Sequence, residues 1–215
     1  DWFEVPPEGR SAPGLGQFSV LMPPGTYTVK LMVGGQEFSQ PLEVRKDPNS
    51  GGSLEEVRTQ VARLHDLQGD MNAAVDLYNQ AEMIRVQLQG LQRALGTDGS
   101  VAADVRAAAD SLERKTIALE EQLHQLRVTN RGQDGIRWPV RLIGQINYLS
   151  NGMGSSDFAP TTQQVQVHEL LKSQVRALQG QMRQLVERDV AAFNQLLRQR
   201  NVAGVVTTVR EPGVP

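Results

Sequence analysis

The sequence contains a histidine–glutamate pair, His168–Glu169, of the kind that opens the H-E-x-x-H motif of zinc proteases. In that motif a second histidine follows one helical turn later, so that both imidazoles bind the metal. Lys172 occupies that position here, so the second metal ligand is missing. The other histidines, His65 and His124, fall in separate predicted helices. We therefore predict solvated histidines on helix faces and no metal site.

Two pairs of adjacent carboxylates, Glu55–Glu56 and Glu120–Glu121, are candidates for the acid–base chemistry of glycosidases. Adjacent residues of a helix diverge around its axis, whereas that chemistry needs carboxylates opposed across a cleft. The first pair falls at a predicted helix start, where negative charge is favourable. We interpret the second pair as part of a solvated charged face. The basic residues near it in the sequence are Arg114, Lys115 and Arg127.

A glycine- and serine-containing segment, residues 152–156, has the composition of a phosphate-binding loop. It follows a predicted helix rather than a strand and lacks the lysine of a P-loop, so we interpret it as a connection between helices. The chain has no cysteine, which excludes disulfides, thiolate metal ligands and a cysteine nucleophile. No serine lies in a G-x-S-x-G turn. We therefore predict no catalytic residue, no cofactor-binding residue and no cofactor, and a chain that is not itself an enzyme.

The composition limits the classes of protein to which the chain can belong. The formal net charge of its 215 residues is −2 at pH 7, and the arginines are spread along the predicted helices, which argues against a nucleic-acid-binding surface. Hydrophobic residues make up 39% and aromatic residues 5%, so a core must be built from leucine, valine and alanine, as in packed helices. No apolar run reaches the roughly 18 residues of a membrane span. We predict no nucleic-acid partner and no membrane span.

The sequence around residues 26–45 has the alternation of a β-hairpin. Gly34–Gly35 provides the turn, and Pro41 is expected on the edge side because it cannot donate to the ladder. Tyr27 is expected to bond back to an upstream backbone group, as tyrosines of late sandwich strands do. The apolar residues of one face are Tyr27, Val29, Leu31, Val33, Phe38, Leu42 and Val44.

This hairpin looks like the closing edge of an immunoglobulin-like sandwich, which needs about seven strands in roughly 100 residues. Residues 1–25 are rich in proline and glycine, with a possible short strand at residues 18–22. We interpret residues 1–48 as a partial β-sandwich segment, followed by a linker at residues 49–53. We therefore expect the chain to be the C-terminal part of a larger protein.

Helical periodicity dominates the rest of the chain. Ser53 with Glu56, and Thr161 with Gln164, match the capping box that opens a helix. Pro139 is expected in the first turn of a shorter helix. The predicted helices are residues 53–95, 100–128, about 139–149 and 161–201.

Apolar residues three and four apart give the long helices continuous seams of the coiled-coil type. In the first helix the phase slips between Tyr78 and Ala81, which predicts local overwinding or a bend. The seam of the last helix consists of Val167, Leu171, Val175, Leu178, Met182, Leu185, Val190, Phe193 and Leu197. We predict a mainly α fold in which an up-down bundle of three long helices and one short helix, residues 53–201, follows the small antiparallel hairpin. Residues 202–215 are expected to form a tail that is either frayed or docked in an extended form.

Several phrases of the sequence resemble one family of bacterial proteins. These are large sortilin-like (VPS10-type) β-propeller proteins with BNR/Asp-box repeats, often labelled glycosyl-hydrolase-like. After the propeller they carry an immunoglobulin-like segment and a helical C-terminal region. The phrases that carry the resemblance are PGTYTVKL (24–31), QPLEV (40–44), KDP (46–48), RLIG (141–144), APT (159–161) and DVAAFNQLL (189–197).

The resemblance implies a periplasmic or secreted parent whose propeller, in the same polypeptide, is the partner of this region. It carries over no site residue. We accordingly expect a non-catalytic structural or interaction module. The alternatives are a helical oligomerisation or partner-binding module, because long seams also pair between chains, and an accessory domain of a glycoside hydrolase-like enzyme whose site lies on the propeller.

Overall fold

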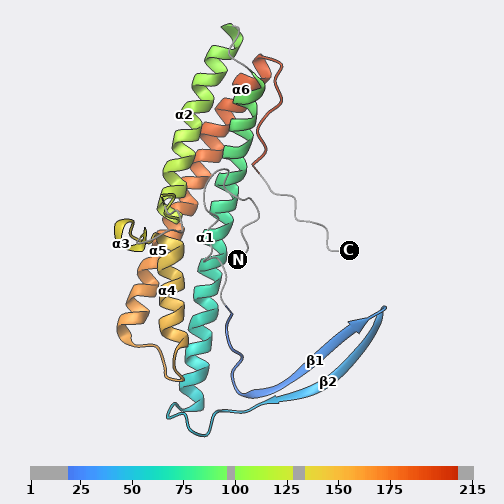
Figure 1. Cartoon of the computed structure of the whole chain (residues 1–215), viewed down its shortest axis with the longest axis vertical. Coiled ribbons are helices and arrows are strands. Elements are labelled where there is room, and N and C mark those ends of the chain that lie inside the picture. Colours follow the sequence, from blue (N-terminus) through green and yellow to red (C-terminus); the bar gives the residue numbers. More distant parts are fainter. Residues whose placement is uncertain (1–18, 96–99, 128–133, 208–215) are drawn as a thin grey trace.

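The computed structural model describes residues 19–95, 100–127 and 134–207, which form a helical bundle with a β-hairpin at one end (Figure 1). This arrangement confirms the predicted mainly α fold with an N-terminal antiparallel hairpin. The elements are β1 (Gly25–Val33), β2 (Gln36–Val44), α1 (Leu54–Ala94), α2 (Ser100–Leu123), α3 (Asp134–Arg137), α4 (Leu142–Gly154), α5 (Thr162–Gln184), the π-helical segment η1 (Leu185–Val190) and α6 (Ala191–Gln199).

Helix α1 is the longest helix of the bundle. Its 41 residues make it about 60 Å long at 1.5 Å per residue. Ser53 and Glu56 form the expected capping box at its start, and the helix continues through Tyr78 and Ala81. Helices α2 and α6 lie along one half of α1 and helices α4 and α5 along the other (Figure 1). At each level three rods therefore lie side by side, since α2 and α4 follow one another along the bundle.

The π-helical segment η1 joins α5 to α6 in one continuous rod, and the sequence explains why it is needed. The core residues of this rod recur every three or four positions up to Leu185, but the next one is Val190, five positions later. A π turn contains one residue more than an α turn. The extra residue lets Val190 and Phe193 face the same core as Leu185.

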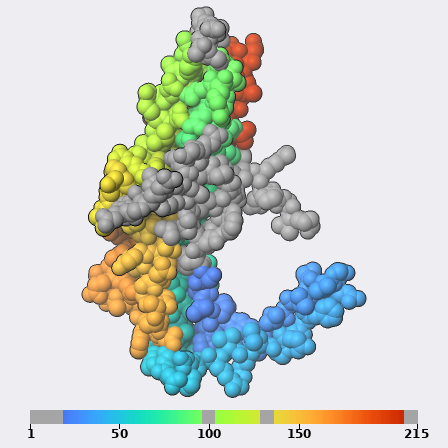
Figure 2. Space-filling view, viewed as in Figure 1, coloured from blue at the N-terminus to red at the C-terminus, as the bar shows by residue number. Residues whose placement is uncertain are grey.

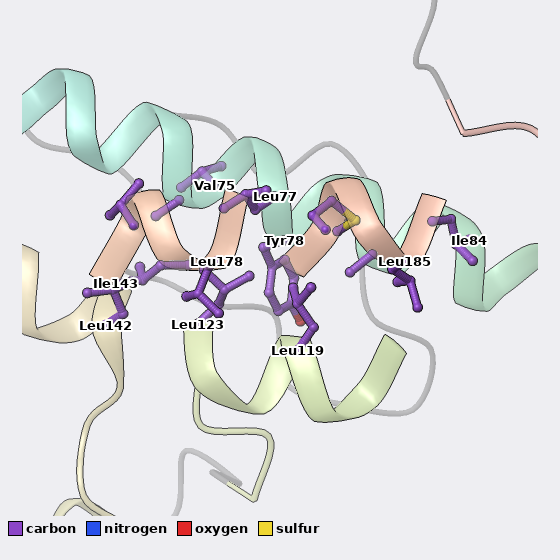
Figure 3. Close-up of a cluster of buried hydrophobic side chains, with 14 of the residues drawn as sticks. Val75, Leu77, Tyr78, Ile84, Leu119, Leu123, Leu142, Ile143, Leu178 and Leu185 are labelled. Carbon is purple, nitrogen blue, oxygen red and sulfur yellow. The ribbon is translucent and has the colours of Figure 1, made fainter. Parts of the chain in front are cut away.

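Side chains from α1, α2, α4 and α5–η1 converge in the core around Tyr78 (Figure 3). Most seam residues of the last helix are buried as predicted, but Val167 is exposed. Within the described part of the chain, no helix combines the length and the apolar character that crossing a bilayer requires.

Some boundaries and short elements differ from the predictions. Helix α4 begins at Leu142 rather than around Pro139, whose carbonyl accepts a hydrogen bond from Gln125 at 3.3 Å and is held outside the helix. The short helix α3 was not predicted at all. Residues 19–22 form no strand, and Phe18 lies outside the described residues.

The first part of the predicted tail, residues 202–207, is docked in an extended form rather than frayed. The side-chain amide of Asn194 on α6 both donates to and accepts from the backbone of Val205, at 2.9 and 2.7 Å. Gln87 on α1 does the same with Val206, at 2.9 Å in both directions. These side-chain amides form the hydrogen bonds with the tail that a neighbouring β-strand would otherwise form. Residues 208–215 lie outside the described residues.

The hairpin has the predicted turn and register. Val33 pairs with Gln36, and both turn residues have positive φ, 55° at Gly34 and 80° at Gly35. Two consecutive positive values define a type I′ turn, for which Gly-Gly is well suited. The hydroxyl of Tyr27 donates to the carbonyl of Pro23 at 2.5 Å, as expected from its position early in the strand.

Candidate functional site

The hairpin carries an apolar face that is exposed among the described residues. In the observed register Tyr27 is opposite Leu42 and Leu31 is opposite Phe38, and such pairs share one side of a sheet. The exposed fraction is 58% for Leu31 and 54% for Phe38, although both side chains are large and apolar. We call this surface the apolar face and define it as Tyr27, Val29, Leu31, Val33, Phe38 and Leu42.

No described helix covers this face. The two strands contact each other, and neither packs against any helix of the described residues. Figure 2 shows the hairpin extending away from the bundle, with open space between its tip and the helices. An isolated two-stranded hairpin is only marginally stable in water. Burying one such large side chain contributes about 1.5–3 kcal/mol, so this surface has a strong tendency to be covered.

The opposite face of the hairpin is polar. Lys30 and Glu37 form an ion pair at 2.8 Å across the strands, and Glu43 pairs with Arg45 at 2.7 Å. All four side chains are exposed, so these pairs contribute little to stability. They do give the hairpin one polar face and one apolar face, which is the pattern of the outer layer of a β-sandwich.

The hairpin joins the bundle through an ordered connection rather than a loose linker. The backbone N–H of Asn49 donates to the Asp47 carboxylate at 2.8 Å, and Lys46 donates to the carbonyl of Ser50 at 2.6 Å. A Cβ atom on Gly52 would lie 1.8 Å from the carbonyl oxygen of Asp157, so only glycine fits at this crossing. A hollow of about 590 Å³ lies beside this connection, between the residues flanking the hairpin and helices α1 and α4.

The prediction of a solvated His168 is wrong. Its side chain is fully buried, and Nε2 lies 2.8 Å from Asp70 Oδ2 on α1. One turn further along α5, Lys172 donates to both oxygens of Asp66 at 2.5 and 2.7 Å, which holds the pKa of that carboxyl below its ordinary value. These pairs are formed between helices distant in the sequence, so the local pattern around His168 carried no sign of them.

Neither of the other two histidines is fully buried as His168 is. His65 is exposed, and its Nδ1 lies 3.4 Å from Oε1 of Gln68. His124 is half-buried and meets the ring of Tyr78 edge-on, with 5.9 Å between the ring centroids. Among the described residues, no three histidines, aspartates or glutamates are arranged to hold a metal ion.

The prediction for the second acidic pair is half wrong. Glu121 is exposed, but Glu120 is fully buried and lies opposite Arg85, with Oε1 3.5 Å from Nε. Arg85 also bonds Glu82, one turn earlier on α1, and Tyr78 donates to Glu82 at 3.1 Å. We call Glu82, Arg85 and Glu120 the buried ionic cluster. In the sequence, each member is adjacent to an apolar seam residue of α1 or α2. This adjacency was the one sign in the sequence that they would be buried.

The first acidic pair behaves as expected. Glu55 is exposed. Glu56 accepts from the backbone N–H of Ser53 at 2.8 Å, and the Ser53 hydroxyl accepts from the Glu56 N–H. Hydrogen bonds from Ser53, first from its backbone and then from its side chain, lower the pKa of Glu56. This pair therefore caps a helix.

Residues 152–156, considered above as a possible phosphate loop, belong partly to a helix. Gly152, Met153 and Gly154 form the last turn of α4, which is longer than predicted. The amide of Gln60 on α1 donates to the carbonyl of Met153 at 2.7 Å and also to that of Ser156. The segment is thus held by its carbonyl oxygens, which are acceptors and do not bind phosphate.

Comparison of the chain with protein-family models, with curated proteins and with solved structures finds no match.

Proposed function

We propose that this chain is a non-catalytic structural and interaction module of a larger exported protein. In this proposal the bundle is a rigid support, and the hairpin docks its apolar face on a neighbouring β-rich domain. The single observation that carries the proposal is the apolar face, which is regular, amphipathic and uncovered by any described helix.

The arrangement of the buried polar groups supports a non-catalytic role. Glu82 and Glu120 are enclosed in the core and lie against Arg85, so a substrate does not reach them. His168 is enclosed between α1 and α5 in the same way. Such contacts fix how helices pack against one another.

The sequence resemblance supports the nature of the neighbour. In sortilin-like propeller proteins an immunoglobulin-like segment stands between the propeller and the helical region, which is the place of the hairpin in this chain. We infer that the neighbour is the preceding part of the same polypeptide and that the parent is periplasmic or secreted.

A second candidate function is partner binding through the helices. Val167 and Leu170 lie one turn apart on α5, and both are exposed, with 58% of Leu170 accessible. Apolar residues at this spacing are typical of a helix face that contacts another helix. The two functions predict different sensitive residues, so one experiment separates them.

The experiment pairs this chain with the region encoded upstream of Asp1, expressed as a separate polypeptide. Replacing Leu31 and Phe38 together by glutamine is expected to weaken the complex roughly 30-fold, since about 1 kcal/mol is lost for each half-buried side chain. Calorimetric titration measures the affinity. The matched control is the Val167→Gln/Leu170→Gln double variant, which removes two exposed apolar side chains from the bundle and is expected to change the affinity less than twofold.

Two outcomes contradict the proposal. If only the α5 double variant weakens the complex, the helices and not the hairpin bind the neighbour. If the reading frame encodes no preceding domain, or the two polypeptides do not associate, the chain is not a module of this kind.

A further inference from the structure

The turn of the hairpin determines which backbone groups point outward. In a two-residue β-turn the carbonyl of Val33 accepts from the N–H of Gln36, so this pair is hydrogen-bonded. Hydrogen-bonded and non-hydrogen-bonded pairs then alternate along an antiparallel ladder. The residues of the non-hydrogen-bonded pairs direct their N–H and C=O groups away from the partner strand. These pairs are Met32–Glu37, Lys30–Ser39, Thr28–Pro41 and Thr26–Glu43.

The outer edge of β2 is closed to a further strand. One of its outward positions is Pro41, which has no N–H to donate. Two others, Glu37 and Glu43, carry exposed carboxylates. Proline and charged side chains are the means by which natural sheets prevent pairing at an edge.

The outer edge of β1 is open as far as the described residues show. All of its outward positions keep both a backbone donor and a backbone acceptor, and two of them are threonines, which favour strands. The single charged side chain there is Lys30, which is exposed and already pairs with Glu37 of β2 at 2.8 Å. Neither strand contacts a described helix, so no described helix covers this edge. In Figure 1, β1 is the upper strand of the ribbon. The outward residues of β1 are Thr26, Thr28, Lys30 and Met32.

We propose that the neighbour adds a β-strand to the free edge of β1. The backbone of this strand bonds the outward groups of β1, and its apolar side chains extend the apolar face. The inference rests on the proposed function and deepens it, because it names the edge and the chemistry of the partner: an extended segment with alternating apolar side chains, belonging to a β-sheet.

A second copy of this chain fits the edge less well. Two β1 strands paired antiparallel about Val29 place Thr28 opposite Lys30, without a clash of charges. However, this pairing sets two apolar faces side by side and covers neither. A β-sheet domain covers the apolar face with a second layer while one of its strands extends β1.

The test uses the full chain and a synthetic peptide with the sequence of β2, residues 36–44, carrying Pro41→Thr. This peptide has alternating apolar side chains and no missing backbone donor. Binding is followed by NMR titration of the labelled chain. We expect amide shifts and protection from exchange at the outward residues of β1, with those of β2 unchanged.

Two proline variants form the matched comparison. Thr28→Pro removes an outward donor of β1, and Ser39→Pro removes one of β2, and neither donor is used within the hairpin. Thr28→Pro is expected to weaken peptide binding at least 10-fold and Ser39→Pro less than twofold. The amide resonances of Gly34 and Gly35 report whether the hairpin is intact in each variant.

The proposal is overturned if the peptide does not bind the unmodified chain, if Thr28→Pro binds it normally, or if Ser39→Pro is the weaker variant. It is also overturned if the chain alone dimerises in sedimentation and Thr28→Pro abolishes the dimer, because the partner is then a second copy. Failure of the proposed function is seen separately, in the Leu31→Gln/Phe38→Gln variant with the preceding region.

Discussion

Replacing Arg85 by methionine is expected to lower the free energy of unfolding by about 3–5 kcal/mol, the cost of removing one member of a buried ion pair. Arg85 lies against the carboxylates of Glu82 on α1 and Glu120 on α2, and all three side chains are buried. Methionine fills much the same volume, so the loss comes from the charge rather than from a cavity. Urea denaturation followed by circular dichroism measures the change.

Two further variants make this result specific. Arg63→Met removes an arginine whose pair with Glu169, at 3.3 Å, is partly exposed, and is expected to cost less than about 1 kcal/mol. Combining Arg85→Met with Glu82→Gln and Glu120→Gln also removes the two buried carboxylate charges and is expected to recover most of the stability. If Arg85→Met is as mild as Arg63→Met, the cluster does not hold α1 and α2 together.

Deleting Glu187 from the π-helical segment is expected to leave the fold intact. Glu187 is exposed and lies between the core residues Leu185 and Val190. Its removal shortens their spacing from five residues to four, which is the spacing of an α-helix. The π turn becomes an α turn, and every core residue of α6 keeps its orientation.

Deleting Gln174 from α5 is the matched control with the opposite result. Gln174 is also exposed, but the helix around it is regular. Removing one residue there rotates the following seam by about 100° relative to the preceding one. Cooperative unfolding is expected to be lost, as judged by circular dichroism. Equal tolerance of the two deletions, or equal loss, would contradict the role given to η1.

Local signals were sufficient to predict most elements of the fold. Gly34–Gly35 predicted the hairpin turn, and the capping boxes at Ser53 and Thr161 predicted the starts of two long helices. The step of five before Val190 was also present in the sequence, but it was not interpreted as a π turn. Each of these features depends on residues close together in the chain, so it can be predicted from a single sequence.

The features that the sequence did not predict depend on partners distant in the chain. His168 is buried because Asp70 lies beside it on α1. Glu120 is buried because Arg85 is placed opposite it. Helix α4 continues to Gly154, despite its polar and glycine-rich end, where Gln60 bonds the carbonyl of Met153. Judged by residue type alone, His168, Glu120 and the end of α4 were each predicted to be exposed to solvent.

The candidate site was predicted in part. The alternation of apolar and polar residues along the two strands predicted the apolar face of the hairpin, with Leu31 and Phe38 on one side. Whether a helix covers this face could not be predicted from the sequence, since that depends on the direction in which the linker places the hairpin. The sequence also did not distinguish the two edges, because the outward positions follow from the observed register and turn.

The most direct test of the docking role is amide hydrogen exchange of residues 25–44 in this chain alone and in the full-length polypeptide of its gene. We predict fast exchange across the hairpin in the isolated chain, because an uncovered two-stranded ribbon opens readily, and protection at least roughly 100-fold greater in the full-length protein. Helix α1 serves as the internal reference and is expected to exchange slowly in both. Equal exchange of the hairpin in the two proteins would contradict the account.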